Sequence, residues 1–156
     1  MLLSNFVGAL HDRRPQAPRL LGSGAPSIAL VAYRGLRSGG VEMSRVAVTG
    51  GRDYADEAWV ETVLDAARQR LGLTVLVHGG APGLDTLADR WAKRRKVPAE
   101  VYPAEWRRWG RSAGPRRNQQ MVDTAPDVLI AFRGGRGTDN MKSVARYAGV
   151  RVIEVR

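Results

Sequence analysis

Short apolar runs that end in glycine alternate with helical patterns from residue 44 to the end of the chain. Residues 45–51 (RVAVTGG) and 74–80 (TVLVHGG) are rich in β-branched and aliphatic residues, and each run ends in two glycines. Such runs are typical of buried strands that lead into tight turns. A helical spacing of apolar residues follows each run, and Gly72 ends the first predicted helix.

The same alternation continues through the rest of the chain. Apolar residues from Leu84 onward follow the i, i+3, i+4, i+7 spacing of a second helix. Further strands are predicted at 99–104, 127–132 and 151–155, and further helices around 115–125 and 141–148. Strands that alternate with helices form parallel βαβ units with right-handed crossovers. We therefore expect an α/β fold, a Rossmann-like three-layer sandwich with a mainly parallel five-stranded sheet.

Residues 1–43 differ from the rest of the chain. They mix Pro, Gly, Ser and Arg without sustained periodicity, which is typical of a flexible arm, and within them residues 28–33 (IALVAY) indicate a short strand or a surface-packed segment. A chain of 156 residues is long enough for one buried core. We expect a flexible N-terminal arm over 1–43 and one domain over 44–156. Met43 is a candidate start of translation, because codons for the preceding SGGVE can resemble a ribosome-binding leader.

The composition narrows the chemistry that the chain can perform. It contains no cysteine, which excludes disulfides, thiolate catalysis and cysteine-ligated zinc. The two histidines, His11 and His78, have no ligand partner at the spacing of a metal site, so we expect no metal. The formal net charge of +10 favours an anionic partner.

The sequence shows no feature of a membrane or exported protein. No apolar run reaches the roughly 18 to 20 residues that a membrane span requires. The opening MLLSNFVGAL has no basic residue ahead of its apolar stretch, and no cleavage site of small residues follows it. We therefore expect a cytoplasmic protein without a membrane partner.

Three glycine-rich corners follow predicted strands: TGGRD at 49–53, HGGAPGLD at 78–85 and RGGRGTDN at 133–140. The carboxyl ends of parallel strands share one edge of a sheet, which also collects the positive ends of the following helices. Without a Cβ, backbone N–H groups can approach an anion closely. The corners therefore predict a site for a phosphate or a sugar, although one such corner alone is usually a tight turn. Neither a G-x-x-x-x-G-K-[ST] nor a G-x-G-x-x-G motif is present.

The motifs VTGGRDYAD, HGGAPGLDTLADRWA, WRRWGRSAGPRRNQQMV and AFRGGRGTDNM occur in this order within residues 44–156. Together they resemble the YspA (cpYpsA-related) branch of the SLOG superfamily, which joins the DNA-processing protein DprA with the LOG proteins. The resemblance implies a Rossmann-like fold that binds a nucleotide or a nucleotide-derived ligand, as a sensor or as a nucleotide-processing protein. It also leaves a homodimer open, because relatives often pair through helices that flank the site.

Carried over by position, the resemblance implies a set of ligand contacts in four segments. They are Gly50, Gly51, Arg52 and Asp53 in the first loop, His78, Gly79, Gly80, Ala81, Gly83 and Asp85 in the second, Arg117 and Asn118 after the third strand, and Gly134, Gly135, Gly137 and Thr138 before the last helix. Four of them have an alternative explanation in the fold alone. Arg52 can be a surface charge, Asp85 a helix cap, His78 a packed histidine, and Asn118 a tie between loops.

Whether the ligand is also hydrolysed is left open by the sequence. LOG relatives that release the base from nucleoside monophosphates carry P-G-G-x-G-T-x-x-E, and the Glu of that motif falls on Met141 here. An oxocarbenium-like sugar then lacks its obvious carboxylate, for which Asp85 and Asp139 are the remaining candidates. A LOG-like nucleoside-monophosphate phosphoribohydrolase is therefore one alternative function.

Single-stranded nucleic-acid binding, as in DprA, is the other alternative. EWRRWGR at 105–111 interleaves two tryptophans with three arginines, and RWAKRRK at 90–96 adds five basic residues. Aromatic rings beside guanidinium groups can stack bases and neutralise phosphates. The same spacing also allows Trp106 and Trp109 to lie on one side of a helical turn and roof a small-ligand pocket.

Overall fold

The computed structural model describes residues 44–156, and its centre is one five-stranded sheet. The strands are β1 (Ser44–Thr49), β2 (Leu73–His78), β3 (Ala99–Val101), β4 (Val128–Ala131) and β5 (Arg151–Glu154). Their order in the sheet is β3-β2-β1-β4-β5, and every neighbouring pair in the described part is parallel. The predicted α/β fold is confirmed. The predictions for residues 1–43, namely the flexible arm, a strand at 28–33 and a start at Met43, lie outside the described residues.

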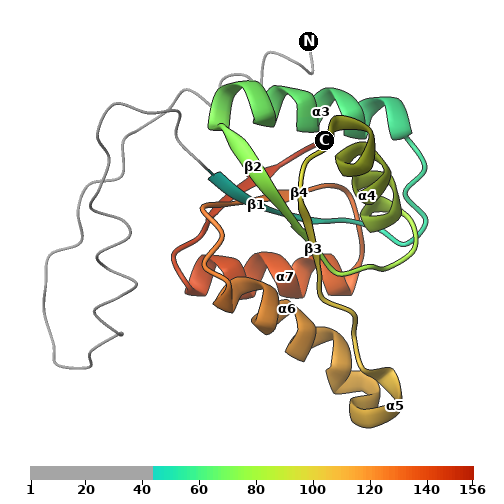
Figure 1. The fold of residues 1–156 in the computed structure, drawn as a ribbon. Helices are drawn as coiled ribbons and strands as arrows, with labels where there is room; N and C mark the ends of the chain where they lie inside the picture. The colour runs from blue at the N-terminus through green and yellow to red at the C-terminus, as the bar shows by residue number, and fades with distance from the viewer. Residues whose placement is uncertain (1–43) are drawn as a thin grey trace, which may run out of the picture.

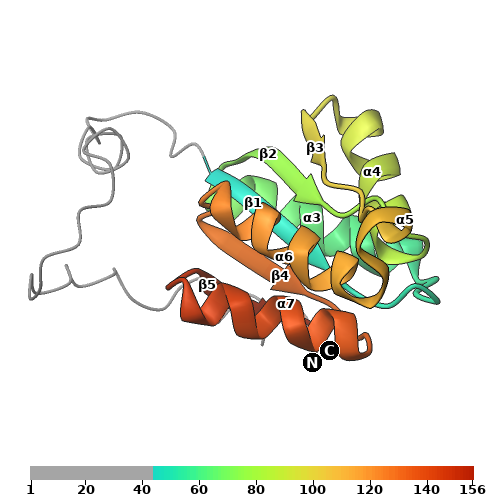
Figure 2. The same ribbon diagram turned by 90° about the horizontal axis from the view of Figure 1, so that it is seen from below.

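Helices cover both faces of the sheet. One face carries α3 (Glu57–Leu71) and α4 (Leu84–Arg95), and the other carries α6 (Ala113–Asp123) and α7 (Arg136–Tyr147) (Figure 1). Seen from below, α6 and α7 run side by side across the sheet (Figure 2). A short helix, α5 (Trp106–Trp109), and a 3-10 turn, η1 (Gly110–Ser112), link β3 to α6 and lie beyond the end of the sheet (Figure 1).

The strands place alternate side chains in two separate cores, as the period of two in a β-strand requires. Val46 and Val48 of β1 belong to the core under α3 and α4, which also buries Trp91 completely. Ala47 of β1 belongs to the opposite core, under α6 and α7, together with Met141. The two faces of β1 are both buried, which explains why its sequence is an uninterrupted apolar run.

Local signals define where the helices begin and end. The Asp56 carboxylate accepts a hydrogen bond from Trp59 N at 3.0 Å and so caps α3. Gly72 follows α3 with φ of 63° and ends it as predicted. Within the described part of the chain, no helix is long and apolar enough to cross a bilayer.

The strand order creates a switch point beside β1. The chain passes from β1 to β2 and β3 on one side, and then crosses to β4 and β5 on the other. The connections after β1 and after β4 therefore leave the sheet in opposite directions. In sheets of this type, ligands bind in the crevice that opens at this point, beyond the carboxyl ends of the strands.

Candidate ligand-binding site

Three glycine-rich loops meet at the carboxyl edge of the sheet. They follow β1, β2 and β4 and span residues 50–53, 79–83 and 132–135. Gly51 N donates to Arg133 O at 2.9 Å, which joins the first loop to the third. Gly51 O accepts from Leu84 N at 3.1 Å, which joins the first loop to the start of α4. The prediction that the three corners share one edge is confirmed.

Several glycines in these loops are required by the packing of the loops themselves, among them Gly83 and Gly50. Gly83 has φ of +76°, and a Cβ there would collide with the backbone of Gly51 and Arg52. A Cβ on Gly50 would collide with the Leu84 side chain. Gly50 and Gly83 thus hold α4 close to β1, and this role needs no ligand.

The second loop is closed by Asp85 of α4, which is buried. Its Oδ2 accepts hydrogen bonds from Gly79 N and from Ala81 N, both at 3.1 Å. Burial raises the pKa of the Asp85 carboxyl, although these N–H donors and the nearby Arg117 guanidinium act in the opposite direction. The N–H groups of Gly79 and Ala81 are therefore engaged within the protein and are not offered to a ligand in this geometry.

His78, at the end of β2, is packed rather than exposed to the loop surface. Its side chain is 2% exposed, and its Nδ1 accepts a hydrogen bond from Gly80 N at 3.2 Å. Its Nε2 lies 3.5 Å from Asp89 Oδ1 without a hydrogen bond. Burial lowers the pKa of His78, against the pull of Asp85 and Asp89. These contacts match the packed-histidine interpretation.

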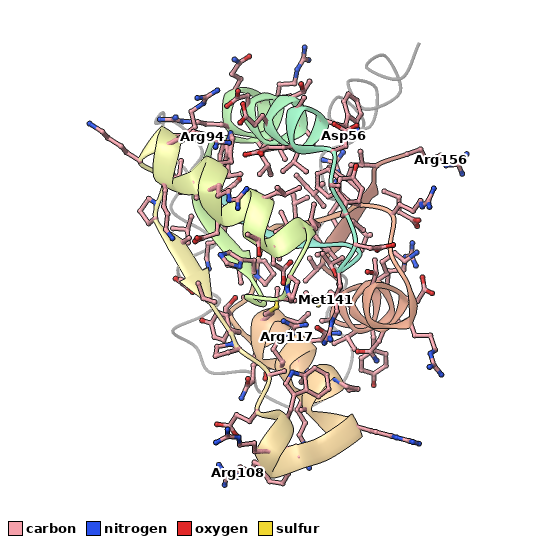
Figure 3. The ribbon with its side chains drawn as sticks, turned by 90° about the vertical axis from the view of Figure 1, so that its right-hand side faces the viewer. Asp56, Arg94, Arg108, Arg117, Met141 and Arg156 are labelled. Atoms are coloured by element: carbon pink, nitrogen blue, oxygen red, sulfur yellow. The ribbon has the colours of Figure 1, made fainter. Side chains whose placement is uncertain are left out.

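Arg117, on α6, lies across the second loop. A Cβ on Gly79 would collide with its guanidinium, so the side chain rests directly on the Gly79 backbone. Its Nη1 lies 3.9 Å from Asp85 Oδ2, and burial lowers the pKa of Arg117. Figure 3 views the carboxyl edge and shows Arg117 near its centre, whereas Arg108 lies at the outer end with α5.

Asn118 is buried beside Arg117 and connects α6 to the third loop. Its Oδ1 accepts from Arg117 Nε at 3.0 Å, and its Nδ2 donates to Gly137 O at 3.2 Å and to Asn140 Oδ1 at 2.8 Å. These bonds hold the Arg117 guanidinium in place. They also fix the start of α7 relative to α6, as the loop-tie interpretation of Asn118 expects.

A pocket of about 210 Å³, here called the loop pocket, opens between the second loop and the segment after β3. One wall carries Arg52, whose Cζ lies 5.2 Å from the centre of the Trp106 ring. No carboxylate lines the pocket among residues 44–156, so its charge is positive. The lining consists of Arg52, Gly79, Gly80, Ala81, Pro82, Pro103, Ala104, Trp106 and Arg117.

The start of α7 differs from the second loop, because its backbone N–H groups are not engaged within the described part of the protein. No side chain caps this helix, and the N–H groups of Arg136, Gly137 and Thr138 have no acceptor among residues 44–156. A Cβ on Gly135 or on Gly137 would meet nothing within 4 Å, and neither glycine has a positive φ. Thr138 is buried beside Gly134, where a Cβ would collide with its hydroxyl.

The two predicted catalytic candidates lie in different environments. Asp139 is exposed on the first turn of α7, where its carboxylate pairs with Lys142 Nζ at 3.0 Å. Asp85 is buried under the second loop, as described above. Met141, at the position of the LOG glutamate, is fully buried in the core under α6 and α7. Asp53 lies in the exposed part of the first loop, beside Gly51.

Sequence reasoning missed part of the pocket wall. Pro82, Pro103 and Ala104 line the loop pocket, and none of them was among the predicted ligand contacts. Trp106 lines it too, in the position predicted for a roof. No group of three His, Asp or Glu side chains in the described part of the chain could hold a metal ion.

The strand order and the loops at the carboxyl edge define the chain as a Rossmann-like α/β protein. The same fold occurs in DNA processing protein A (DprA) from Streptococcus pneumoniae, with a TM-score of 0.57 at 21% sequence identity. The match covers 73% of this chain and 50% of that protein. The chain thus spans about half the length of this DprA.

Sequence comparison identifies the family. A model of the YspA, cpYpsA-related SLOG family matches residues 44–109. The Gene 61 protein of Mycobacterium phage D29 is 41% identical over 120 residues, and the match covers 71% of this chain and 95% of the phage protein. The chain belongs to the YspA, cpYpsA-related SLOG family, which confirms the resemblance seen in its glycine motifs.

Proposed function

We propose that the chain binds a nucleotide or a nucleotide-derived small molecule at the carboxyl edge of the sheet. Membership in the SLOG family and the DprA-like fold point to a function that involves nucleotides or nucleic acids. In the proposed complex, a phosphate lies at the start of α7, and Arg52 and Arg117 face the rest of the ligand in the loop pocket. Trp106 covers the pocket and offers a ring for stacking.

The observation that carries the proposal is the start of α7. Gly135 and Gly137 have open space at the Cβ position and no positive φ, so the fold does not require glycine there. The adjacent N–H groups lack acceptors within residues 44–156 and point out of the positive end of a helix. An anion that approaches the bare backbone explains both the missing side chains and the unpaired donors.

The contacts favour binding over N-glycoside hydrolysis. The residue at the position of the LOG glutamate is the buried Met141, and Asp139 is paired with Lys142. Release of free base from nucleoside monophosphates at high protein concentration would instead support the phosphoribohydrolase alternative.

Isothermal titration with the four 5′-mononucleotides tests the proposal. We expect at least one to bind, and Thr138→Val and Arg52→Gln each to weaken it by about tenfold, the effect of losing one charged or phosphate hydrogen bond. Thr62→Val and Arg151→Gln are the matched controls. Thr62 lies on the exposed side of α3, and Arg151 begins β5 at the opposite edge of the sheet.

The salt dependence separates this function from nucleic-acid binding. A mononucleotide touches few cations, so we expect its affinity to fall only modestly between 50 and 200 mM salt. A protein that contacts six to ten phosphates loses about 10³ to 10⁵ in affinity over that range. Absence of binding by every mononucleotide, or equal losses in the site variants and the controls, would refute the proposal.

A further inference from the structure

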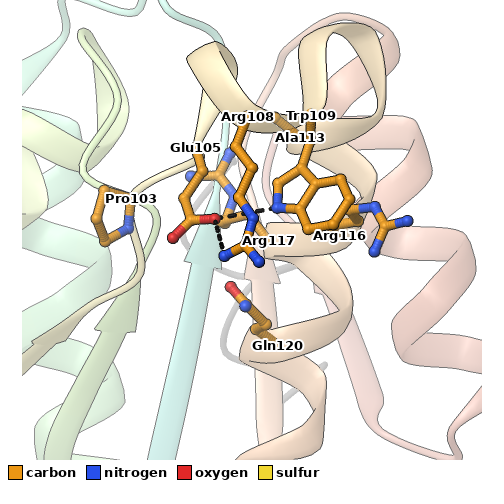
Figure 4. Close-up of a pocket in the computed structure, with 8 residues that line it drawn as sticks. All are labelled: Pro103, Glu105, Arg108, Trp109, Ala113, Arg116, Arg117 and Gln120. Carbon is orange, nitrogen blue, oxygen red and sulfur yellow. Dashed lines mark hydrogen bonds and ion pairs between the residues drawn. The ribbon is translucent and has the colours of Figure 1, made fainter.

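A second pocket adjoins the loop pocket on the side of α5. It has a volume of about 190 Å³ and is here called the α5 pocket. Pro103 and Arg117 belong to the walls of both pockets, so the two are neighbours that share a side. The α5 pocket is lined by Pro103, Glu105, Arg108, Trp109, Ala113, Arg116, Arg117 and Gln120 (Figure 4).

The α5 pocket carries an excess of positive charge on an ordered frame. Arg116 Cζ lies 4.0 Å and Arg108 Cζ 4.7 Å from the centre of the Trp109 ring. Glu105 accepts a hydrogen bond from Trp109 Nε1 at 3.0 Å and lies 3.6 Å from Arg108, and Figure 4 shows both interactions. Arg116 has no carboxylate within 4.0 Å in the part of the chain that the structure describes.

A guanidinium that stacks on an aromatic ring keeps its N–H edge free. That edge matches the geometry of a phosphate, and the ring limits the motion of the long side chain, so less entropy is lost on binding. The Arg116 guanidinium is thus ordered before a ligand binds, and its free N–H edge suits a phosphate. Arg117, on the wall common to both pockets, is held by Asn118 and stands between Arg52 on one side and Arg116 on the other.

The two volumes also indicate a shared ligand. Each pocket alone is smaller than the roughly 300 to 1,000 Å³ of typical small-molecule sites, whereas the two together reach that range. We infer that the α5 pocket is a second subsite, and that the ligand is a dinucleotide-type molecule with two phosphate-bearing units. One unit occupies the loop pocket, the other reaches Arg116 in the α5 pocket, and Arg117 contacts the phosphate between them. This inference rests on the proposed function of the loop pocket.

Titration of the full chain with paired probes tests the inference. The probes are the four 5′-mononucleotides and the corresponding 5′-phosphorylated homodinucleotides. We expect one dinucleotide to bind about tenfold more tightly than its mononucleotide. Arg116→Gln should remove most of that gain and change mononucleotide binding less than about twofold, whereas Arg52→Gln should weaken both probes.

Arg107→Gln is the matched control, because Arg107 belongs to α5 but lines neither pocket. It should leave the affinity for both probes unchanged. Trp109→Leu provides a second variant and should reproduce Arg116→Gln, since it removes the ring that orders the guanidinium. Circular dichroism of both variants shows whether the fold is retained.

The outcomes separate the two proposals. A dinucleotide that binds no better than its mononucleotide, or that Arg116→Gln and Trp109→Leu do not affect, overturns the second subsite and leaves the loop pocket standing. Failure of both probe classes overturns both proposals. Affinity that keeps rising from dinucleotide to a ten-nucleotide strand, with equal losses in Arg107→Gln and Arg116→Gln, indicates a nucleic-acid track instead and also overturns the inference.

Discussion

The glycines at the carboxyl edge differ in whether the fold requires them, and Gly83 and Gly137 are the two extremes. Gly83 combines a left-handed backbone with close contact to the first loop, so the fold depends on it. Gly137 has free space at the Cβ position and lies within the first turn of α7, where alanine is the better helix former. The fold therefore requires glycine at position 83 but not at position 137, where we propose that the bare backbone contacts the ligand.

Opposite effects on stability are expected when each of these glycines is changed to alanine. Gly83→Ala should lower the free energy of unfolding by about 2 kcal/mol or more, because φ is positive and the Cβ meets backbone. Gly137→Ala should leave the free energy of unfolding unchanged or raise it by up to about 1 kcal/mol. Urea denaturation measures both values. The same Gly137→Ala chain should bind mononucleotide more weakly, and unchanged binding would show that the open backbone is not a contact.

His78 should make stability depend on pH in the weakly acidic range. Its pKa is lowered in the folded state by burial, and the groups that face it are Asp85, Asp89 and Arg117. Below the ordinary histidine pKa of about 6.5, the unfolded chain takes up a proton at His78 more readily than the folded chain does. The free energy of unfolding that neutral His78 contributes is therefore fully present above this pH and is lost as the pH falls. The loss attributable to this group is at most about 1.4 kcal/mol per pH unit.

Unfolding of wild type and His78→Asn between pH 7.5 and 5.5 measures this effect. Asparagine keeps an acceptor for Gly80 N but does not titrate, so its stability should vary less with pH than that of the wild type. Parallel pH profiles for the two chains would contradict the account of His78.

At the scale of elements, the main features follow from the pattern of the sequence. The five strands, α3, α4, α6 and α7 arise from apolar periodicity and glycine stops, which act locally. The glycine loops lie at the same edge because the strands that they follow are parallel, and this could be predicted from the order of strands and helices. The short helix α5 carries too little periodicity in its four residues for a firm prediction, and a helical turn at the tryptophan pair was only one of two interpretations of that segment.

The role of Asp85 shows why part of the site could not be predicted. Its carboxylate accepts two N–H groups of the second loop only because α4 begins at Leu84 and is held by Gly51. That register depends on contacts between loops distant in the sequence. The same reason applies to Pro103. It lines both pockets because of the path that the chain takes after β3, and that path depends on contacts with loops distant in the sequence.

The connection between α6 and α7 depends on Asn118. Asn118→Ala should lower the free energy of unfolding by about 1 to 3 kcal/mol, because buried partners on Arg117 and at the start of α7 lose their hydrogen bonds. It should also weaken nucleotide binding, since Arg117 is no longer held. Gln119→Ala, at an exposed neighbouring position on α6, is the control for thermal denaturation. Equal stability of the two variants would argue against a tie between the helices.

For the whole molecule, the distribution of charge matters more than its total. The formal net charge is +10, yet basic side chains on α4 are paired with carboxylates, such as Arg94 with Glu57 and Arg95 with Asp65 of α3. Arg52 and Arg116, which line the two pockets, have no such partner among residues 44–156. Each of the two pockets is therefore lined by at least one arginine without a carboxylate partner.

The central claim is that backbone donors at the start of α7 hold the phosphate of the ligand. Titration of the ¹⁵N-labelled chain with the best-binding mononucleotide, followed through its backbone amide resonances, tests it most directly. We predict the largest and saturable shifts at Arg136, Gly137 and Thr138, whose N–H groups are unpaired in the described structure, and smaller shifts at Gly79 and Ala81, whose N–H groups bond to Asp85. Saturable shifts elsewhere that leave the α7 amides unmoved would contradict the account.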